Sequence, residues 1–177
     1  MTFADNRILM LVLNSSVLAA LLLLPVPALA DCTPIGQQVS TSRFVVSGDE
    51  VHDKSTKLGW SRCPVGMHFQ EGRCVGTATL MTLPEAEEHA RTLGKDWRLA
   101  SVDELLSIVE PRCNNPAIDT ALFPGASELF EGQSKYWSST PSDVMPGLMY
   151  NVDFTDGTVD ANSEGIPMGV RFVRTLP

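Results

Sequence analysis

Apolar residues recur at helical spacing in two stretches of the chain, and each stretch opens with a capping signal. In residues 82–94, Thr82 and Glu85 form a capping box, Pro84 lies in the first turn, and Gly94 supplies a left-handed stop. This pattern predicts a first helix that ends at Gly94.

The stretch DWRLASVDELLSIVEPRC, residues 96–113, predicts the second helix. Ser101 and Glu104 form its capping box, and Pro111 is expected to end it. Its apolar face is expected to contain Leu105, Leu106, Ile108 and Val109.

The residues before this helix predict a buried, extended segment. Trp97 and Leu99 are expected to point into the core, whereas Arg98, between them, points the other way. A carboxylate such as Asp103 or Asp119 is then expected to hold Arg98 in a salt bridge. On this interpretation the segment belongs to the scaffold and not to a site.

Strand patterns lie on both sides of the helices. They occupy residues 43–48, 49–63, 135–140, 148–161 and 169–176, with turns at 54–56 and at Asp156-Gly157. Residues 114–134 are rich in Pro, Asn, Gly and Ser, which is typical of a loop. The order of elements indicates an α+β domain in which two helices pack on antiparallel sheet.

The first thirty residues have the pattern of a secretory signal peptide. Arg7 gives a positive start, the apolar run VLAALLLL follows, and Ala28 and Ala30 fit a signal-peptidase site before Asp31. A retained membrane anchor is the alternative, but polar residues and prolines interrupt the run before the ~18 apolar residues that a span needs. We therefore expect export to the periplasm, the cell surface or the medium.

Cleavage would leave a tail over residues 31–42 and one domain over residues 43–177. The whole chain has 21 acidic and 13 basic residues, a formal charge of −8, and no basic run. This balance argues against binding to nucleic acid or to acidic membranes.

Four cysteines remain after the signal peptide, and an even count in an exported chain predicts two disulfides with three possible connectivities. The short loop between Cys63 and Cys74 favours that pair, which leaves Cys32 with Cys113. A zinc site is disfavoured because the cysteines are widely spaced and the three histidines form no paired motif.

Several longer motifs occur in a characteristic order. They are KSTKLGWSRCPVGMHFQEGRC, TLPEAEEHA, WRLASVDELLSIVEPRC, PAIDTALFP, YWSST, VDFTDG and VRFVR. In this order they resemble the Lcl C-terminal domain family of bacterial exported proteins, over roughly residues 43–174. Two positions depart from the family pattern: Ala100 stands where proline is usual, and Leu83 lies near a frequent tryptophan.

The resemblance implies a C-type-lectin-like fold and a binding or adhesion module of the cell envelope or surface. For the collagen-like namesake of the family it implies adhesion to sulfated polysaccharide. That ligand does not transfer readily, because sulfated chains attract clustered lysine and arginine and this sequence is acidic with dispersed cations.

No arrangement of residues predicts catalysis. The nucleophile elbow Gly-x-Ser-x-Gly is absent, an even cysteine count leaves no free thiol, and no histidine lies near Ser138 or Ser139 in the sequence. We therefore expect no catalytic residue and no enzymatic activity. The alternatives are a carbohydrate-active enzyme or other hydrolase with a hidden site, and a structural subunit of the envelope.

The segment DANSEG, residues 160–165, resembles the first half of a calcium loop. Asp160, Asn162 and Glu164 stand at alternate positions, and Asp156 could add another oxygen. The twelfth position is Arg171, where a calcium loop needs glutamate. Calcium bound by these four oxygen donors is one hypothesis, an acidic solvated turn is the other, and no further cofactor is expected.

Ligand binding is expected in the loops and not at the tryptophan motifs. Trp60, Trp97 and Trp137 each fall inside one of the family motifs, and Trp97 and Trp137, which have apolar neighbours, are predicted to be core. The partner is unknown, with a glycan or an envelope or surface protein as the candidates. The candidate ligand-binding residues are Asp153, Asp156, Asp160, Asn162 and Glu164.

Overall fold

The structure is a computed structural model that describes residues 43–177, except 95, 114, 127–128 and 130–133. The predicted signal peptide and tail lie outside the described residues, as does Cys32. The first part of the described chain contains β1 (Phe44–Ser47), β2 (Glu50–Asp53), β3 (Leu58–Ser61), β4 (Met67–Gln70), β5 (Arg73–Gly76) and α1 (Leu83–Leu93). The second part contains β6 (Arg98–Leu99), α2 (Val102–Ser107), β7 (Lys135–Pro141), β8 (Met149–Asp153), β9 (Thr158–Asn162) and β10 (Phe172–Thr175).

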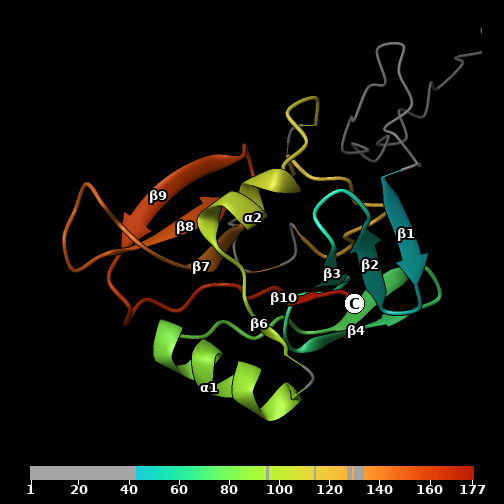
Figure 1. The fold of residues 1–177 in the computed structure, drawn as a ribbon, viewed down its shortest axis with the longest axis horizontal. Helices are drawn as coiled ribbons and strands as arrows, with labels where there is room; N and C mark the ends of the chain where they lie inside the picture. Colours follow the sequence, from blue (N-terminus) through green and yellow to red (C-terminus); the bar gives the residue numbers. More distant parts are fainter. Residues whose placement is uncertain (1–42, 95, 114, 127–128, 130–133) are drawn as a thin grey trace, which may run out of the picture.

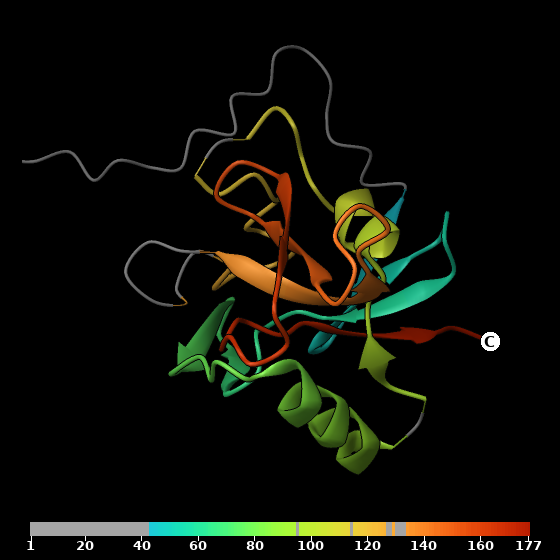
Figure 2. The same ribbon diagram turned by 90° about the vertical axis from the view of Figure 1, so that its left-hand side faces the viewer.

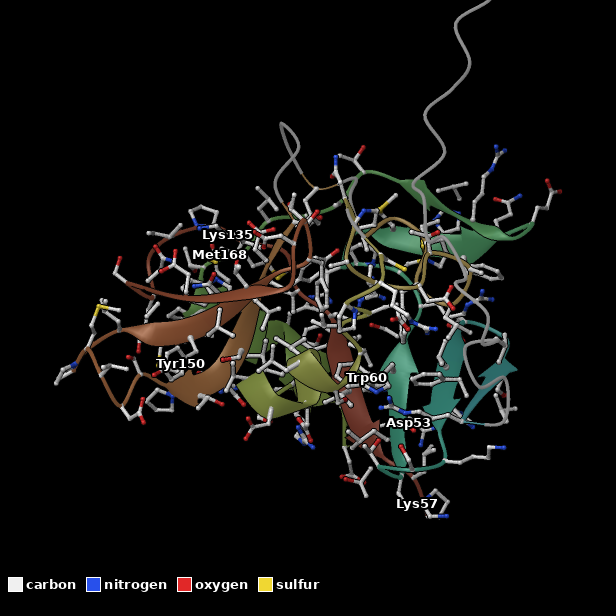
Figure 3. All side chains as sticks on the ribbon, turned by 90° about the horizontal axis from the view of Figure 1, so that it is seen from above. Asp53, Lys57, Trp60, Lys135, Tyr150 and Met168 are labelled. Carbon is white, nitrogen blue, oxygen red and sulfur yellow. A yellow bond between two sulfur atoms is a disulfide. The ribbon has the colours of Figure 1, made fainter. Side chains whose placement is uncertain are left out.

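The strands form antiparallel sheets, which confirms the predicted α+β class. A five-stranded sheet has the order β1-β2-β3-β10-β6, so the last strand of the chain lies between two early ones. A three-stranded sheet, β7-β8-β9, and the separate hairpin β4-β5 complete the fold. Figure 3 shows Trp60 and Asp53 on the five-stranded sheet, away from Lys135 and Tyr150 on the three-stranded sheet.

The two helices lie on opposite sides of β10 (Figures 1 and 2). On the α1 side, Phe172 and Leu99 join buried residues of the helix in one core cluster, which we call the α1 core. On the α2 side, Trp60 and Val173 join Leu105 in a second cluster, the α2 core. Successive residues of β10 thus face different cores, as the twofold period of a strand requires.

Both predicted capping boxes are present. The Glu85 carboxylate accepts hydrogen bonds from the backbone amide of Thr82 at 2.9 Å and from its hydroxyl at 2.7 Å. The Glu104 carboxylate accepts the Ser101 amide at 2.8 Å, and Ser101 Oγ accepts the Glu104 amide at 3.2 Å. These bonds satisfy amides that a helix start leaves without partners.

The second helix is shorter than its apolar pattern predicts. It ends at Ser107, and Ile108 is its C-cap, well before Pro111. Beyond it the chain doubles back, because Val109 bridges to Ile118 across the following loop. Leu106 was wrongly assigned to the apolar face: its side chain is 37% exposed.

The predicted disulfide between Cys63 and Cys74 is present, and it closes the β4-β5 hairpin. Gly66 enters this hairpin with a φ of +88°, and a Cβ there would lie 2.3 Å from Thr79 Oγ1. Only glycine fits such a position. The predicted link between Cys113 and Cys32 stays a prediction, because Cys32 lies outside the described residues.

Asp53 organises the turn between β2 and β3. Its buried carboxylate accepts hydrogen bonds from Arg43, at 2.6 and 3.0 Å, and from the hydroxyls of Ser55 and Thr56, both at 2.7 Å. Burial alone would raise the pKa of Asp53, but these hydrogen bonds outweigh it and lower the pKa well below its ordinary value. The turn is therefore held by a charged group inside the fold.

Arg171 is a fully buried cation. Its Nη1 donates to the backbone carbonyls of Ser61 and Arg62, both at 2.6 Å. The guanidinium lies 5.1 Å from the ring of Phe123 and 5.6 Å from that of Tyr136. Burial lowers the pKa of Arg171. Carbonyl dipoles and aromatic faces therefore stabilise this charge.

Candidate functional site

Trp97 lies at the surface between α1 and the five-stranded sheet. The indole is partly buried against the α1 core, and the Arg174 guanidinium lies 5.5 Å from its ring centre. The prediction that Trp97 is a core residue is therefore wrong in part. The short strand β6, which follows Trp97, buries Leu99, whereas Trp97 itself lies before the strand and stays partly exposed.

Trp97 is a wall of two adjacent grooves. The first groove has a volume of about 350 Å³. Apart from Trp97, it is lined by Glu87, Ala90, Arg91, Arg98, Leu99 and Ser139. Most of these side chains are charged or polar and exposed, so this groove offers hydrogen-bonding groups beside an aromatic ring.

The second groove has a volume of about 280 Å³. Apart from Trp97, it is lined by Asp49, Ser61, Cys63, Pro64, Val65, Met67, His89, Leu93 and Phe172. The His89 ring stacks on Phe172, with 5.7 Å between centroids and 16° between planes. Both apolar and polar side chains line this groove, and one wall contains a disulfide cysteine.

Arg98 on the first groove has a carboxylate partner, but not one of those predicted. Its Nη1 and Nη2 each donate to Glu104 at 2.7 Å, whereas Asp103 and Asp119 were expected. These bonds raise the pKa of Arg98. Burial would raise the pKa of Glu104, but the bonds from Arg98 and Ser101 lower it overall. The capping residue of α2 thus fixes the groove wall as well.

A chain of polar side chains continues from Trp97 across the outer face of the sheet. Arg174 donates to Glu50 at 2.9 and 3.2 Å, and Glu50 also lies 3.0 Å from His52 Nε2. All three side chains are partly exposed. They hold Arg174 beside the indole, although none of the three lines either groove.

The comparison with models of protein families gives one match, to the Lcl C-terminal domain, over residues 49–174. The chain belongs to this family. None of the curated proteins matches it.

The three tryptophans in the motifs of the Lcl C-terminal domain differ in how deeply they are buried. Trp60 and Trp137 are fully buried, which confirms the prediction for Trp137, and Trp137 Nε1 donates to the Met81 carbonyl at 3.0 Å. Of the three tryptophans, Trp97 alone reaches the surface. The two departures from the family pattern, Leu83 and Ala100, are both buried.

The acidic residues that were predicted to bind a ligand lie in the β8-β9 hairpin of this Lcl C-terminal domain and directly after it. The hairpin turns at Asp156-Gly157, as predicted. Asp156 accepts the Thr158 amide at 3.0 Å and its hydroxyl at 2.7 Å, and the hydroxyl bond comes first among the causes that lower the pKa of Asp156. Asp153 accepts the Thr155 amide at 2.8 Å. These carboxylates therefore serve the local backbone.

Asp160 and Asn162 project from β9 and Glu164 follows it. Asp160 accepts the Ala161 amide at 2.8 Å and pairs with Lys135 at 3.1 Å. The Ala161 amide bond is the first cause that lowers the pKa of Asp160. Among the described residues, no group of three or more His, Cys, Asp or Glu side chains is arranged to hold a metal ion. The calcium hypothesis thus gains no support from this geometry, and it stays a prediction.

The second groove also contains the residue types of a hydrolase: Ser61, His89 and Asp49. Ser61 Oγ, however, accepts the Phe172 amide at 3.2 Å, and His89 stacks on Phe172. No hydrogen bond among the described residues joins His89 to Ser61 or to Asp49. Ser138 and Ser139 donate to carbonyls of the core strands and loops.

The part of the candidate site that α1 supplies was not predicted. His89 and Leu93 lie one helical turn apart and both line the second groove. One signal was present in the sequence: Leu93 is an apolar residue directly before the Gly94 stop and one turn after His89. The structure leaves 42% of this leucine exposed, at the second groove.

Proposed function

We propose that this chain is an exported, non-catalytic binding module of the bacterial cell envelope or surface, and that its ligand lies in the two grooves beside Trp97. The observation that carries this proposal is that Trp97 lines both grooves and stays partly exposed, while the other two tryptophans are fully buried. An indole offers a ligand a large apolar face and one N–H donor. Concave sites with aromatic walls and a few polar groups are the usual form of a ligand site.

The proposal includes a C-type-lectin-like architecture, a second disulfide between Cys32 and Cys113, and cleavage of the signal peptide before Asp31. The Cys63–Cys74 disulfide supports export, because disulfides persist in oxidising compartments. No helix in the described part of the chain is long and apolar enough to cross a membrane. N-terminal sequencing of the protein from cell fractions tests the export step. A protein that starts at Met1 or fractionates with the cytosol would contradict it.

Fluorescence quenching by acrylamide tests the site directly. Trp97 is the accessible tryptophan, so quenching of the folded protein should come mainly from it and should fall in a Trp97→Phe variant. A glycan array, followed by quenching with each hit, should give ligands that shield Trp97. A ligand that binds with no change in quenching would place the site elsewhere and contradict the proposal.

The variant Asp156→Asn provides a matched control from the region that the sequence favoured. It removes a charge in the β8-β9 turn and should leave ligand affinity unchanged. A broad panel of ester, peptide and glycoside substrates tests the hydrolase alternative. Turnover that Ser61→Ala or His89→Ala abolishes would replace the binding proposal with catalysis.

A further inference from the structure

The first strand, β1, is an outer strand of the five-stranded sheet and lies at its margin (Figure 1). β2 pairs with one edge of β1 along all four of its residues. Among the described residues, no strand pairs with the other edge. Val45 is 46% exposed and Val46 is 47% exposed, although neighbouring residues of a strand point to opposite faces. Both faces of β1 are therefore accessible at this margin.

The pairing with β2 shows which backbone groups of β1 face the open edge. The Lys54 amide donates to the Arg43 carbonyl at 2.9 Å, and in an antiparallel ladder every second residue bonds to the same neighbour. Val45 therefore also bonds to β2. The N–H and C=O groups of Phe44 and Val46 point the other way, where they can bond to a further strand.

β1 lacks the features that protect other outer strands of this protein from pairing. Such strands are usually protected by charge, by proline or by an element that covers them. The outer strand β9 contains Asp160, and β6 is only two residues long and packs on α1 through Leu99. The stretch Phe44–Ser47 has no charged residue and no proline. Of these three outer strands, β1 is the one that can accept another strand.

A second β1 strand matches this edge when the two strands run antiparallel around a twofold axis. Phe44 then lies opposite the partner's Val46, and each such pair exchanges two hydrogen bonds through the backbone groups at the open edge. An aromatic residue opposite a β-branched one is a favourable cross-strand pair. On the other face, Val45 lies opposite the partner's Val45. The edge is thus complementary to itself.

The charges at the two ends of the β1-β2 hairpin favour this antiparallel arrangement. Exposed Lys54 and Lys57 lie at the end where β1 begins, and exposed Asp49 lies in the turn where β1 ends. A twofold axis through β1 brings the lysine end of each copy near the partner's Asp49, whereas a parallel arrangement would place like charges together. The whole chain carries −8, so two copies still repel and salt should strengthen their association.

We propose that a second copy of this chain binds at β1, so that the two copies form one continuous antiparallel sheet across a twofold axis. The strand has four residues, which gives an interface below the ~1,200 Å² of stable complexes, and the dimer is therefore weak and reversible. This property goes beyond the proposed ligand site, because no residue of β1 lines either groove.

Analytical ultracentrifugation of the purified protein from about 10 µM to about 1 mM covers the affinities expected of a weak dimer. The protein should change from monomer to dimer as its concentration rises, and more readily at about 0.15 M salt than at about 0.01 M. A protein that stays monomeric throughout would mean that another segment or another protein covers this edge, and would overturn the proposal.

Two valine variants give a matched comparison. Val45→Lys places two lysines opposite each other at the twofold axis, which should weaken dimerisation at least about tenfold. Val159→Lys changes another exposed valine, on the outer strand β9, and should leave dimerisation unchanged. Equal effects of the two variants, or a loss of dimer with Val159→Lys alone, would overturn the proposal.

Cysteine variants test the register of the two strands. Val45 and the partner's Val45 form a pair without hydrogen bonds, in which Cα atoms lie about 4.5 Å apart, within the range of a disulfide. Val45→Cys should therefore give a covalent dimer on air oxidation. Ser47→Cys is the control, because Ser47 and the partner's Ser47 are separated by roughly 13 Å along the strands. Equal yields from the two variants, or no covalent dimer from Val45→Cys, would contradict this twofold pairing.

Discussion

The carboxylates of the acidic β8-β9 hairpin are already bonded to other groups of the protein, whereas Trp97 in the two grooves stays partly accessible. In the hairpin, Asp153 and Asp156 bond to the backbone of the turn, and Asp160 pairs with Lys135. In the grooves, Trp97 stays partly exposed. The hairpin has the richer polar motif in the sequence, but its carboxylates already bond to the backbone or to Lys135. A count of polar residues is therefore a weaker guide to a site than the partners those residues already have.

The largest expected effect separates the two kinds of tryptophan. Trp137→Ala should lower the free energy of unfolding by about 3–5 kcal/mol, because it opens a cavity in the α1 core. Trp97→Ala should cost less, about 1–2 kcal/mol, since part of the indole is already in water. Urea denaturation measures both values. Equal losses in the free energy of unfolding would show that Trp97 is a core residue. The contrast between the grooves and the hairpin would then no longer hold.

Loss of the Cys63–Cys74 disulfide should have the next largest effect. The two cysteines are 11 residues apart, and opening a loop of this size should lower the free energy of unfolding by about 2–3 kcal/mol. The double variant Cys63→Ser/Cys74→Ser should also weaken ligand binding, because Cys63 is part of the second groove. Binding of unchanged strength in a folded double variant would show that this wall does not contribute.

Glu104→Gln tests the residue that links α2 to the first groove. The change keeps the shape of the side chain but removes the charge that Arg98 and the Ser101 amide contact, at a cost of about 1–2 kcal/mol at pH 7. The pKa of Glu104 is lowered in the folded state, so its contribution is present above its unfolded pKa of about 4.3. It is lost as the pH falls through the folded value.

Melting at a series of pH values measures this contribution. The difference between wild type and Glu104→Gln should be largest near neutral pH and should shrink below about pH 4. The control is Glu110→Gln, which removes a carboxylate paired with nearby Arg112 away from both grooves. A constant difference at every pH would rule out a charge effect at Glu104.

The smallest effect is expected in the hairpin. Asp160→Asn removes the carboxylate that pairs with Lys135, and Asp160 is 51% exposed, so the free energy of unfolding should change by at most about 1 kcal/mol. Melting with calcium and with chelator should give the same result for wild type and variant. A calcium-dependent rise in the melting temperature that Asp160→Asn abolishes would restore the calcium hypothesis and make the hairpin a site.

Local signals in the sequence predicted the parts of the fold that local bonds decide. Both helix starts follow from capping boxes, and the β8-β9 turn follows from Asp156-Gly157, where a φ of +82° suits glycine. The end of α2 could not be predicted in this way. The pairing of Val109 with Ile118 ends it, and this is a contact with the next loop that no helical pattern contains.

The site was harder to predict because its side chains come from segments far apart in the sequence. Arg98 was expected to pair with Asp103 or Asp119, but the capping geometry already aims Glu104 back toward the residues before α2. The exposure of Trp97 depends on where α1 ends relative to β10, which apolar neighbours in the sequence do not reveal. The family motifs identified the scaffold correctly and did not mark the one tryptophan that reaches its surface.

The buried Arg171 has a consequence for how a ligand would be received. Its guanidinium holds the carbonyls of Ser61 and Arg62, and the next residue, Cys63, is fixed to Cys74. Ser61 and Cys63 both line the second groove, so one wall of it is rigid before any ligand arrives. A pre-organised wall spares the entropy that ordering a loop on binding would cost. Variants that loosen this wall should therefore act mainly by faster dissociation of the ligand, with little change in its rate of association.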